Sequence, residues 1–284
     1  MNRGHSGVPR ATVVAIGLLA GVPASSSAAV RYVKWDATGA NNGTSWANAY
    51  TSLQTGLTAA VSGDEIWVAA GTYKPAGVNG PRTATFQLKT GVGVYGGFTG
   101  TETSRNQRNS DPATNGTTLS GDLKGNDQPN FVGMTENSYH VVTASSTTAT
   151  AILDGSTIRG GNANGLGFNS AGGGLYVSLG STRITNCRFT GNLAFFGGGL
   201  FIDTGAPPLT NCAFDSNTAV NGGGAVYLYN STAPPFSGCM FIANTARYGA
   251  GLEADNSTPL LTGCTIISNT ASVAGGGMDS FNGA

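Results

Sequence analysis

The stretch NCRFTGNLAFFGGGL at residues 186–200 decides the fold, because the chain repeats its pattern three more times. The further copies are NCAFDSNTAVNGGGA (211–225), GCMFIANTARYGAGL (238–252) and GCTIISNTASVAGGGM (263–278). Each copy carries a cysteine, a large apolar residue two positions later and an asparagine three positions after that. A period of this length indicates stacked supersecondary units, none of which can bury its apolar face alone.

Two sets of residues keep step with this period. They are the cysteines Cys187, Cys212, Cys239 and Cys264 and the asparagines Asn192, Asn217, Asn244 and Asn269. Side chains alternate along a strand, so each cysteine and the aromatic residue two positions later share one side. The repeat is rich in glycine and β-branched residues, and about 25 residues with two or three short strands make one coil of a parallel β-helix. We therefore predict an all-β, right-handed parallel β-helix.

Stacking explains why these identities recur. Neighbouring coils lie about 4.8 Å apart, so equivalent side chains form columns. A cysteine column fills space as a small hydrophobe, and an asparagine column passes amide hydrogen bonds from coil to coil. Four cysteines in an exported chain usually indicate two disulfides. A disulfide, however, needs Cβ atoms about 3.8 Å apart, so we predict four free, buried thiols.

Glycine triplets mark a bend in each coil, and the chain alternates again after them. The triplets begin at Gly172, Gly197, Gly222, Gly249 and Gly275. One side then carries Leu200/Ile202, Ala225/Tyr227, Leu252/Ala254 and Met278/Ser280, and the other carries Phe201/Asp203, Val226/Leu228, Glu253/Asp255 and Asp279/Phe281. We expect the second, charged side to face outward. The apolar residues three positions before each cysteine have the wrong parity for one unbroken strand, which predicts a second bend there.

The N-terminus has the pattern of an export signal. Arg3 and Arg10 precede the apolar run 11–22, and small residues follow it, so residues 1–29 are predicted to be a signal peptide. The run is shorter than the roughly 20 residues that span a bilayer, so we expect that the chain is not an integral membrane protein. Without Arg3 and Arg10, 12 of the 14 basic residues remain against 14 acidic ones, a balance that disfavours nucleic-acid binding.

The remaining chain divides by its pattern. Residues 30–80 are predicted to form an N-terminal cap and first coil, with a helix from about Trp46 to Val61, Ser45 as its N-cap and a first strand at 65–69. A helix over the end of the solenoid hides edge hydrogen-bonding groups. Residues 81–150 are interpreted as irregular early coils with loops, and 151–284 as regular coils that are incomplete at the C-terminus.

The motif F-x-x-N followed by G-G and an apolar residue resembles the repeat of the polymorphic outer membrane proteins, best known from chlamydiae. The first two repeats match it, with FTGN (189–192) and GGLF (198–201), and with FDSN (214–217) and GGAV (223–226). The third repeat keeps FIAN (241–244) but departs in its second half, AGLE. The fourth departs in its first half, IISN (266–269). The upstream stretches, such as GDEIWVAAGTYKP (63–75) and TTLSGD (117–122), resemble the capping region of secreted right-handed β-helix proteins. The resemblance implies a pectin-lyase-like fold, which hosts lyases, hydrolases and adhesins alike.

Candidate chemistry is confined to two groups of carboxylates. Glu253 and Asp255 lie two residues apart on the outward side, and Asp279 lies one coil above Glu253. These three are the candidate catalytic residues, and together with Asp122 and Asp127 they are the candidate calcium ligands. A solvated acidic face and a Gly/Asn-rich turn explain the same residues without any site. His140 is expected to have a structural role. No cofactor is expected to be required, and calcium is the cofactor that these carboxylates would bind.

We expect an exported, cell-surface or extracellular, non-catalytic scaffold for adhesion or glycan binding, in which Tyr176, Phe201 and Val226 extend the acidic column. The alternative is a polysaccharide lyase or glycoside hydrolase that uses the carboxylates. The successive-coil motifs of β-helix polysaccharide hydrolases do not occur in their order here. The expected partners are a polysaccharide or a host or cell surface, and the chain is expected to be a monomer unless its C-terminal end pairs.

Overall fold

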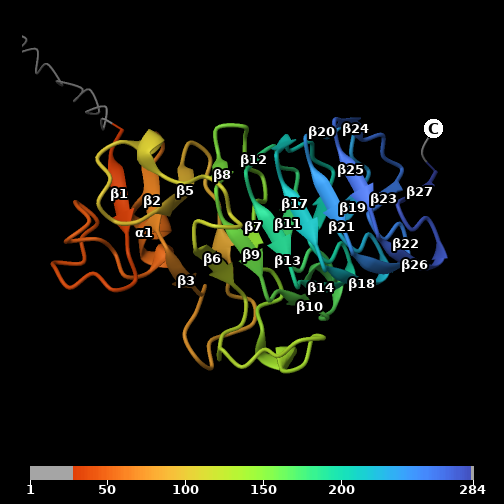
Figure 1. The fold of residues 1–284 in the computed structure, drawn as a ribbon, viewed down its shortest axis with the longest axis horizontal. Helices are drawn as coiled ribbons and strands as arrows, with labels where there is room; N and C mark the ends of the chain where they lie inside the picture. The colour runs from red at the N-terminus through yellow and green to blue at the C-terminus, as the bar shows by residue number, and fades with distance from the viewer. Residues whose placement is uncertain (1–27, 283–284) are drawn as a thin grey trace, which may run out of the picture.

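The computed structural model describes residues 28–282, which form a parallel β-solenoid of about eight coils. The predicted signal peptide, residues 1–29, lies almost wholly outside these residues. The coils succeed one another along the long axis, with β1 at one end and β27 at the other (Figure 1). All named strands pair in parallel with the equivalent strand of the next coil, which confirms the predicted architecture.

Four sheets run along the solenoid, and each regular coil gives one strand to each, where the sequence predicted two or three strands. Sheet A contains β1 (Val30–Val33), β2 (Glu65–Ala69), β5 (Gly93–Phe98), β8 (Ile152–Asp154), β12 (Arg183–Thr185), β16 (Leu209–Thr210), β20 (Pro235–Ser237) and β24 (Leu260–Thr262). Sheet B contains β3 (Gly71–Tyr73), β6 (Thr117–Ser120), β9 (Thr157–Arg159), β13 (Arg188–Thr190), β17 (Ala213–Asp215), β21 (Met240–Ile242) and β25 (Thr265–Ile267).

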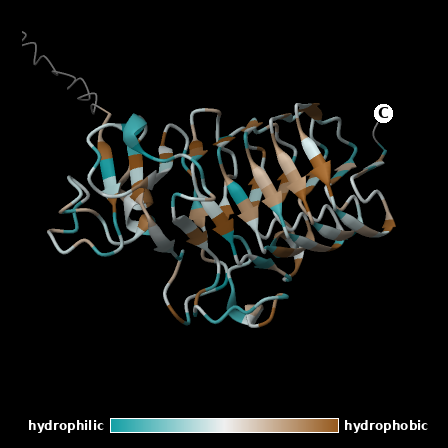
Figure 2. Ribbon diagram, in the orientation of Figure 1, coloured by the Kyte–Doolittle hydropathy of each residue, from teal (hydrophilic) through white to brown (hydrophobic). Residues whose placement is uncertain are grey.

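The other two sheets complete the coil. Sheet C contains β10 (Asn162–Ala163), β14 (Leu193–Phe196), β18 (Thr218–Gly222), β22 (Thr245–Tyr248) and β26 (Thr270–Ala274). Sheet D contains β4 (Phe86–Gln87), β7 (Val142–Thr143), β11 (Leu175–Ser178), β15 (Leu200–Asp203), β19 (Val226–Tyr229), β23 (Leu252–Asp255) and β27 (Met278–Phe281). Hydrophobic colours in Figure 2 fall mainly on strands.

The core is a set of columns, as the period predicted. Phe189, Phe214 and Phe241 are fully buried, and their rings stack at centroid distances of 4.7 and 5.3 Å. All four cysteines are free, and all but the half-buried Cys264 are buried. Burial of a Phe side chain contributes about 1.5–3 kcal/mol, so the column is a major source of stability.

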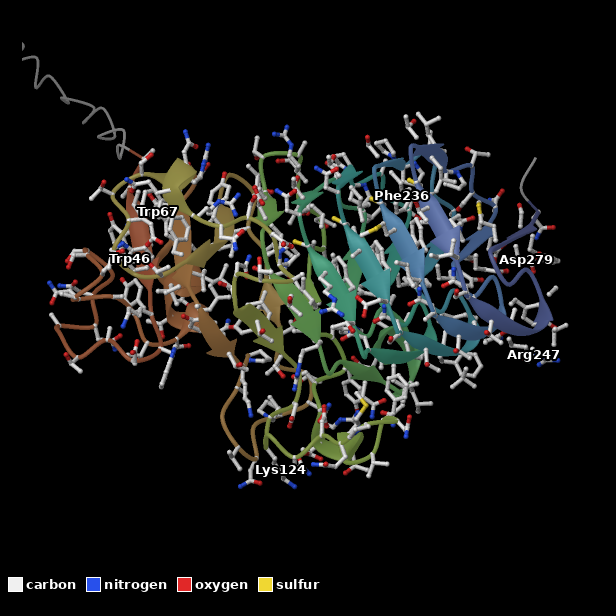
Figure 3. All side chains as sticks on the ribbon, viewed as in Figure 1. Trp46, Trp67, Lys124, Phe236, Arg247 and Asp279 are labelled. Carbon is white, nitrogen blue, oxygen red and sulfur yellow. The ribbon has the colours of Figure 1, made fainter. Side chains whose placement is uncertain are left out.

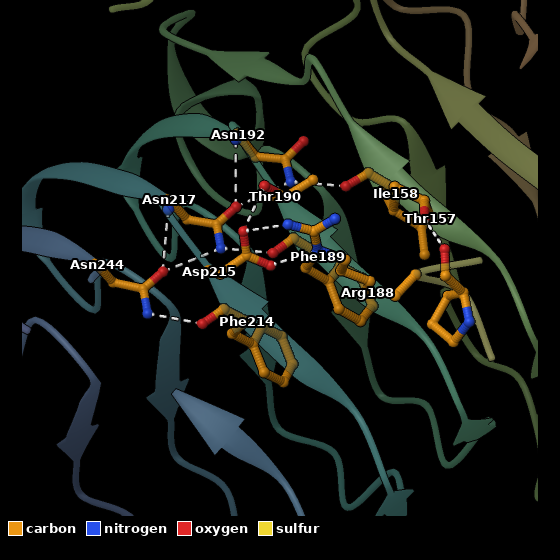
Figure 4. A network of polar contacts seen from close by, with 12 residues as sticks. Thr157, Ile158, Arg188, Phe189, Thr190, Asn192, Phe214, Asp215, Asn217 and Asn244 are labelled. Carbon is orange, nitrogen blue, oxygen red and sulfur yellow. Dashed lines mark hydrogen bonds and ion pairs between the residues drawn. The ribbon is translucent and has the colours of Figure 1, made fainter. Parts of the chain in front are cut away.

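The asparagine column forms the predicted ladder (Figure 4). The Nδ2 of Asn192 donates to Oδ1 of Asn217 at 3.0 Å, and the same bond repeats from Asn217 to Asn244 and from Asn244 to Asn269. Each Oδ1 also accepts the backbone N–H of the preceding asparagine. The backbone carbonyls of Asn192, Asn217 and Asn244 accept N–H groups of the next coil, and the side-chain amides pair the buried backbone N–H groups at this bend.

The predicted bend before each cysteine is confirmed. It lies between sheets A and B, where Asn186, Asn211, Gly238 and Gly263 have φ of 49–62°. A residue with left-handed backbone turns the chain through the corner, and asparagine and glycine tolerate this conformation best.

Two predictions at the N-terminal end and one in the second repeat (211–225) are corrected. The one α-helix among the described residues, α1, covers only Leu53–Ala59 with Ser52 as N-cap, because Ser45 instead accepts the N–H of Asn48 in a turn. Trp46 packs in an aromatic cluster with Trp67 and Phe98. The first strand is β1, which pairs with β2. No helix of residues 28–282 is long and apolar enough to cross a membrane.

After the glycine triplet of the second repeat (211–225) the two sides are exchanged relative to the prediction. The bend glycine is Gly223 (φ 66°), and Gly222 ends β18 opposite Phe196. An irregularity in the pairing of β18 adds one residue before the bend. Val226 and Leu228 therefore face inward and are fully buried, and Tyr227 takes the outward position that the sequence assigned to Val226.

Candidate functional site

The outward face of sheet D carries the candidate residues in two columns. The pairing register places Tyr176, Phe201, Tyr227, Glu253 and Asp279 in the first column. The second column contains Ser178, Asp203, Tyr229, Asp255 and Phe281. The prediction that Asp279 lies one coil beyond Glu253 is thus confirmed in position, and Asp279 is close to the end of the described chain (Figure 3).

The first column begins with an aromatic ladder. The rings of Tyr176 and Phe201 are parallel within 2° at 5.7 Å, and Phe201 stacks on Tyr227 at 5.4 Å. His140 lies 5.2 Å from the Tyr176 ring, and its Nδ1 pairs with the carbonyl of Gly172, as expected for a structural residue. Stacking covers both faces of Phe201, so this ladder presents ring edges, and only 6% of Tyr176 is exposed.

The carboxylates continue where the aromatic ladder ends. Glu253 is buried between Tyr227 and Asp279 in the column, and its Oε2 has no hydrogen-bond partner among the described residues. Burial, reinforced by the charges of Asp279 and Asp255, raises the pKa of Glu253 to about 7. A carboxyl group with such a pKa exchanges protons near neutral pH, as general acids do.

Two glycines make room for this carboxyl group. A Cβ at Gly249 would lie 2.3 Å from Glu253 Oε2, and its φ of 48° already favours glycine. A Cβ at Gly222 would lie 2.8 Å from Cε2 of Tyr227 and 3.3 Å from Cγ of Glu253. Gly249, which turns the chain, and Gly222, which ends β18, therefore leave the space that the glutamate side chain occupies.

Tyr229 has a different environment in the second column. It lies between Asp203 and Asp255 in the register and is 42% exposed. No ring of the described chain stacks on Tyr229, in contrast to its neighbours in the first column. The hydroxyl of Tyr227 donates to Oδ2 of Asp255 at 3.2 Å, which fixes that carboxylate beside the Tyr229 ring. The sequence pattern did not identify Tyr229 as an outward residue, because it assigned the opposite sides to the strand that follows the second repeat.

Comparison with known proteins identifies the family. A family model described as a right handed beta helix region matches residues 140–284. The chain belongs to this family.

The fold of this β-helix protein is also found in a solved structure. A rhamnogalacturonan lyase superposes with a TM-score of 0.54 over 90% of this chain, at 12% sequence identity. The match spans 62% of the lyase chain, and at this identity it indicates a shared fold alone. No curated protein sequence matches the chain.

The other two candidate calcium ligands of the β-helix protein, Asp122 and Asp127, do not lie on sheet D. Asp122 holds its own loop, because Oδ1 accepts the N–H groups of Gly125 and Asn126 and Oδ2 accepts that of Asp127. These N–H groups occupy the oxygens that a calcium ion would need. Within residues 28–282 no three His, Cys, Asp or Glu side chains form a group that could hold a metal ion. Asp122 and Asp127 both lie in the loop between β6 and β7, whereas Glu253 lies in β23.

Proposed function

We propose that this chain is an exported, non-catalytic β-helix scaffold that binds an extended glycan along the outward face of sheet D. The observation that carries the proposal is the exposed ring of Tyr229 between Asp203 and Asp255. An uncovered aromatic ring packs against the C–H face of a sugar, and adjacent carboxylates accept its hydroxyl hydrogens. The parallel strands extend this surface over several coils, as an extended polymer requires.

The location is part of the same proposal. Export is supported by the N-terminal pattern of residues 1–29, and display at the cell surface by the likeness of FTGN and FDSN to the repeats of the polymorphic outer membrane proteins. Adhesion to a host or cell surface would then follow from glycan binding. Fractionation of cells that express the full chain tests this directly: protein retained in the cytoplasm contradicts it.

Binding is tested with a panel of neutral and acidic polysaccharides in affinity gel electrophoresis. Tyr229→Ala should weaken retention by about tenfold, the size of effect that a central aromatic contact usually has. Phe195→Ala is the matched control, because Phe195 is 40% exposed but lies on sheet C. Equal retention of both variants, or retention of the parent by no polysaccharide, contradicts the proposal.

A second candidate function rests on Glu253. Its pKa of about 7 would let it donate a proton to a leaving group, while the Asp255 carboxylate two residues along β23 serves as base. Equivalent atoms two residues apart on a strand are about 6.8 Å apart, within the roughly 6.5–9.5 Å of inverting glycosidases. This arrangement favours a polysaccharide hydrolase or lyase over other enzyme classes.

The two functions differ in turnover. Polyuronides and neutral glycans are incubated with the protein, with and without calcium, and the release of new chain ends is measured. The scaffold proposal expects none. Chain cleavage that is abolished by Asp255→Asn would replace it with the enzymatic one.

A further inference from the structure

A cavity of about 450 Å³ lies away from sheet D, where the loop between β6 and β7 covers part of the outward face of sheet B. The loop extends from the body of the solenoid, and Lys124 marks it in Figure 3. The walls include Asp127 and Phe131 from the loop and Arg159 and Thr190 from the sheet. This volume is in the range of small-molecule sites in proteins.

Asp127 contributes an acceptor that the protein leaves unused. Its Oδ2 accepts a hydrogen bond from Nδ2 of Asn137 at 2.8 Å. Its Oδ1 is buried and has no hydrogen-bond partner among the described residues. Burial raises the pKa of this carboxyl group. An unpaired buried acceptor costs about 1–3 kcal/mol, and a side-chain rotation that turns Oδ1 toward a ligand donor in the cavity would recover this cost.

Arg159 contributes donors to the same cavity. It is the last residue of β9, it is exposed, and no carboxylate of residues 28–282 lies within ion-pair distance of its guanidinium. Its charge acts on Asp127 and opposes the rise in the pKa of that residue. Asp127 and Arg159 are the charged residues of the wall, so its net charge is zero and it suits a neutral ligand.

The loop holds an aromatic ring at this cavity at the expense of backbone strain. Asn130 and Phe131 have φ of 62° and 61°, a conformation that costs a bulky residue about 1–2 kcal/mol. The N–H of Gln128 donates to the carbonyl of Val132 and closes the turn around them. Strain of this kind concentrates at ligand clamps, because it is retained where a side chain must be placed.

We propose that this cavity binds one ring of a neutral sugar. The Asp127 carboxylate accepts a hydroxyl hydrogen, the Arg159 guanidinium donates to a second sugar oxygen, and the Phe131 ring packs on the C–H face. Thr190 adds an acceptor only, because its hydroxyl already donates to Asp215 at 2.8 Å. The site lies on sheet B and shares no residue with the Tyr229 surface, so it stands independently of glycan binding on sheet D.

Binding is measured with the full chain by saturation-transfer NMR and calorimetry, using methyl glycosides of neutral hexoses as probes. Gluconate and glycine serve as anionic and zwitterionic probes. We expect saturable binding of at least one neutral glycoside. Asp127→Asn and Phe131→Ala should each weaken it about tenfold, which is the effect expected for loss of one buried contact.

Lys124→Ala is the control, because Lys124 is exposed on the same loop but lies outside the cavity wall; it should bind within about twofold of the parent. Circular dichroism of each variant verifies the fold, and Tyr229→Ala must leave this binding intact. Three results overturn the proposal: no saturation with any neutral glycoside, binding that survives both cavity substitutions, or stronger binding of gluconate or glycine.

Discussion

Asn217 occupies the middle of the asparagine ladder, and its replacement by alanine tests the fold most directly. Its Nδ2 donates to the carbonyl of Phe189 at 2.8 Å and to Oδ1 of Asn244 at 3.0 Å. Its Oδ1 accepts from the backbone N–H and the Nδ2 of Asn192 at 3.2 and 3.0 Å. The residue is fully buried, so water does not replace these partners.

The size of the effect follows from the groups that Asn217→Ala leaves unpaired. The backbone N–H of Asn192 and one hydrogen of its Nδ2 lose their acceptor, and each such buried donor costs about 1–3 kcal/mol. The free energy of unfolding should therefore fall by about 4 kcal/mol, within a range of roughly 2–6 kcal/mol. Asn269→Ala is the matched control, because Asn269 ends the ladder and is only half-buried. Water can solvate the groups it frees, and its loss should be about 1 kcal/mol.

The assay is urea unfolding followed by circular dichroism, together with hydrogen exchange at the amide of Asn192. In Asn217→Ala that amide should exchange faster than in Asn269→Ala. A loss below about 1 kcal/mol, or equal losses for the two variants, would refute the reasoning, because water would then have to reach the middle of the ladder.

Three further predictions concern single residues. Ala243→Gly should raise the stability by about 0.5–1 kcal/mol in urea unfolding, because Ala243 is exposed with a φ of 53° and glycine has no penalty there; a loss would contradict this. Folded Glu253 binds its proton more tightly than unfolded glutamate (pKa 4.5), so stability falls as pH rises from about 4.5 to about 7. Glu253→Gln should remove this fall, on the order of 2 kcal/mol, and the same pH profile in both proteins would count against it. Thiol titration without reductant should find four reactive cysteines in denaturant and at most Cys264 in the folded protein, and none in denaturant would mean disulfides.

Much of the fold follows from local rules of the repeat. Phe189 follows Cys187 by two residues, so both side chains point inward. Asn192 follows three residues later, which places its amide at the corner. The helix was predicted too long, because the apolar pattern from Trp46 onward also fits a turn whose tryptophan packs against Trp67 and Phe98. Pattern alone does not distinguish these two ways of burying the same residues.

The candidate sites were less predictable than the fold. The sequence identified Glu253 and Asp255, but the single extra residue before Gly223 reversed the sides of β19 and concealed Tyr229. A shift of one residue exchanges the two faces of a strand, so one irregular pairing is enough to misplace a column. Asp127 was identified only as a calcium candidate.

The sequence by itself determined which residues form columns, because the same side chains recur in each coil and stacking superposes them at the strand spacing. Only the tertiary structure decided what surrounds each outward group. Glu253 becomes buried through Tyr227 and Asp279 of the neighbouring coils, and Arg159 meets the loop that carries Asp127 and Phe131. These contacts join residues from different coils and from an irregular loop, and no period in the sequence relates such partners.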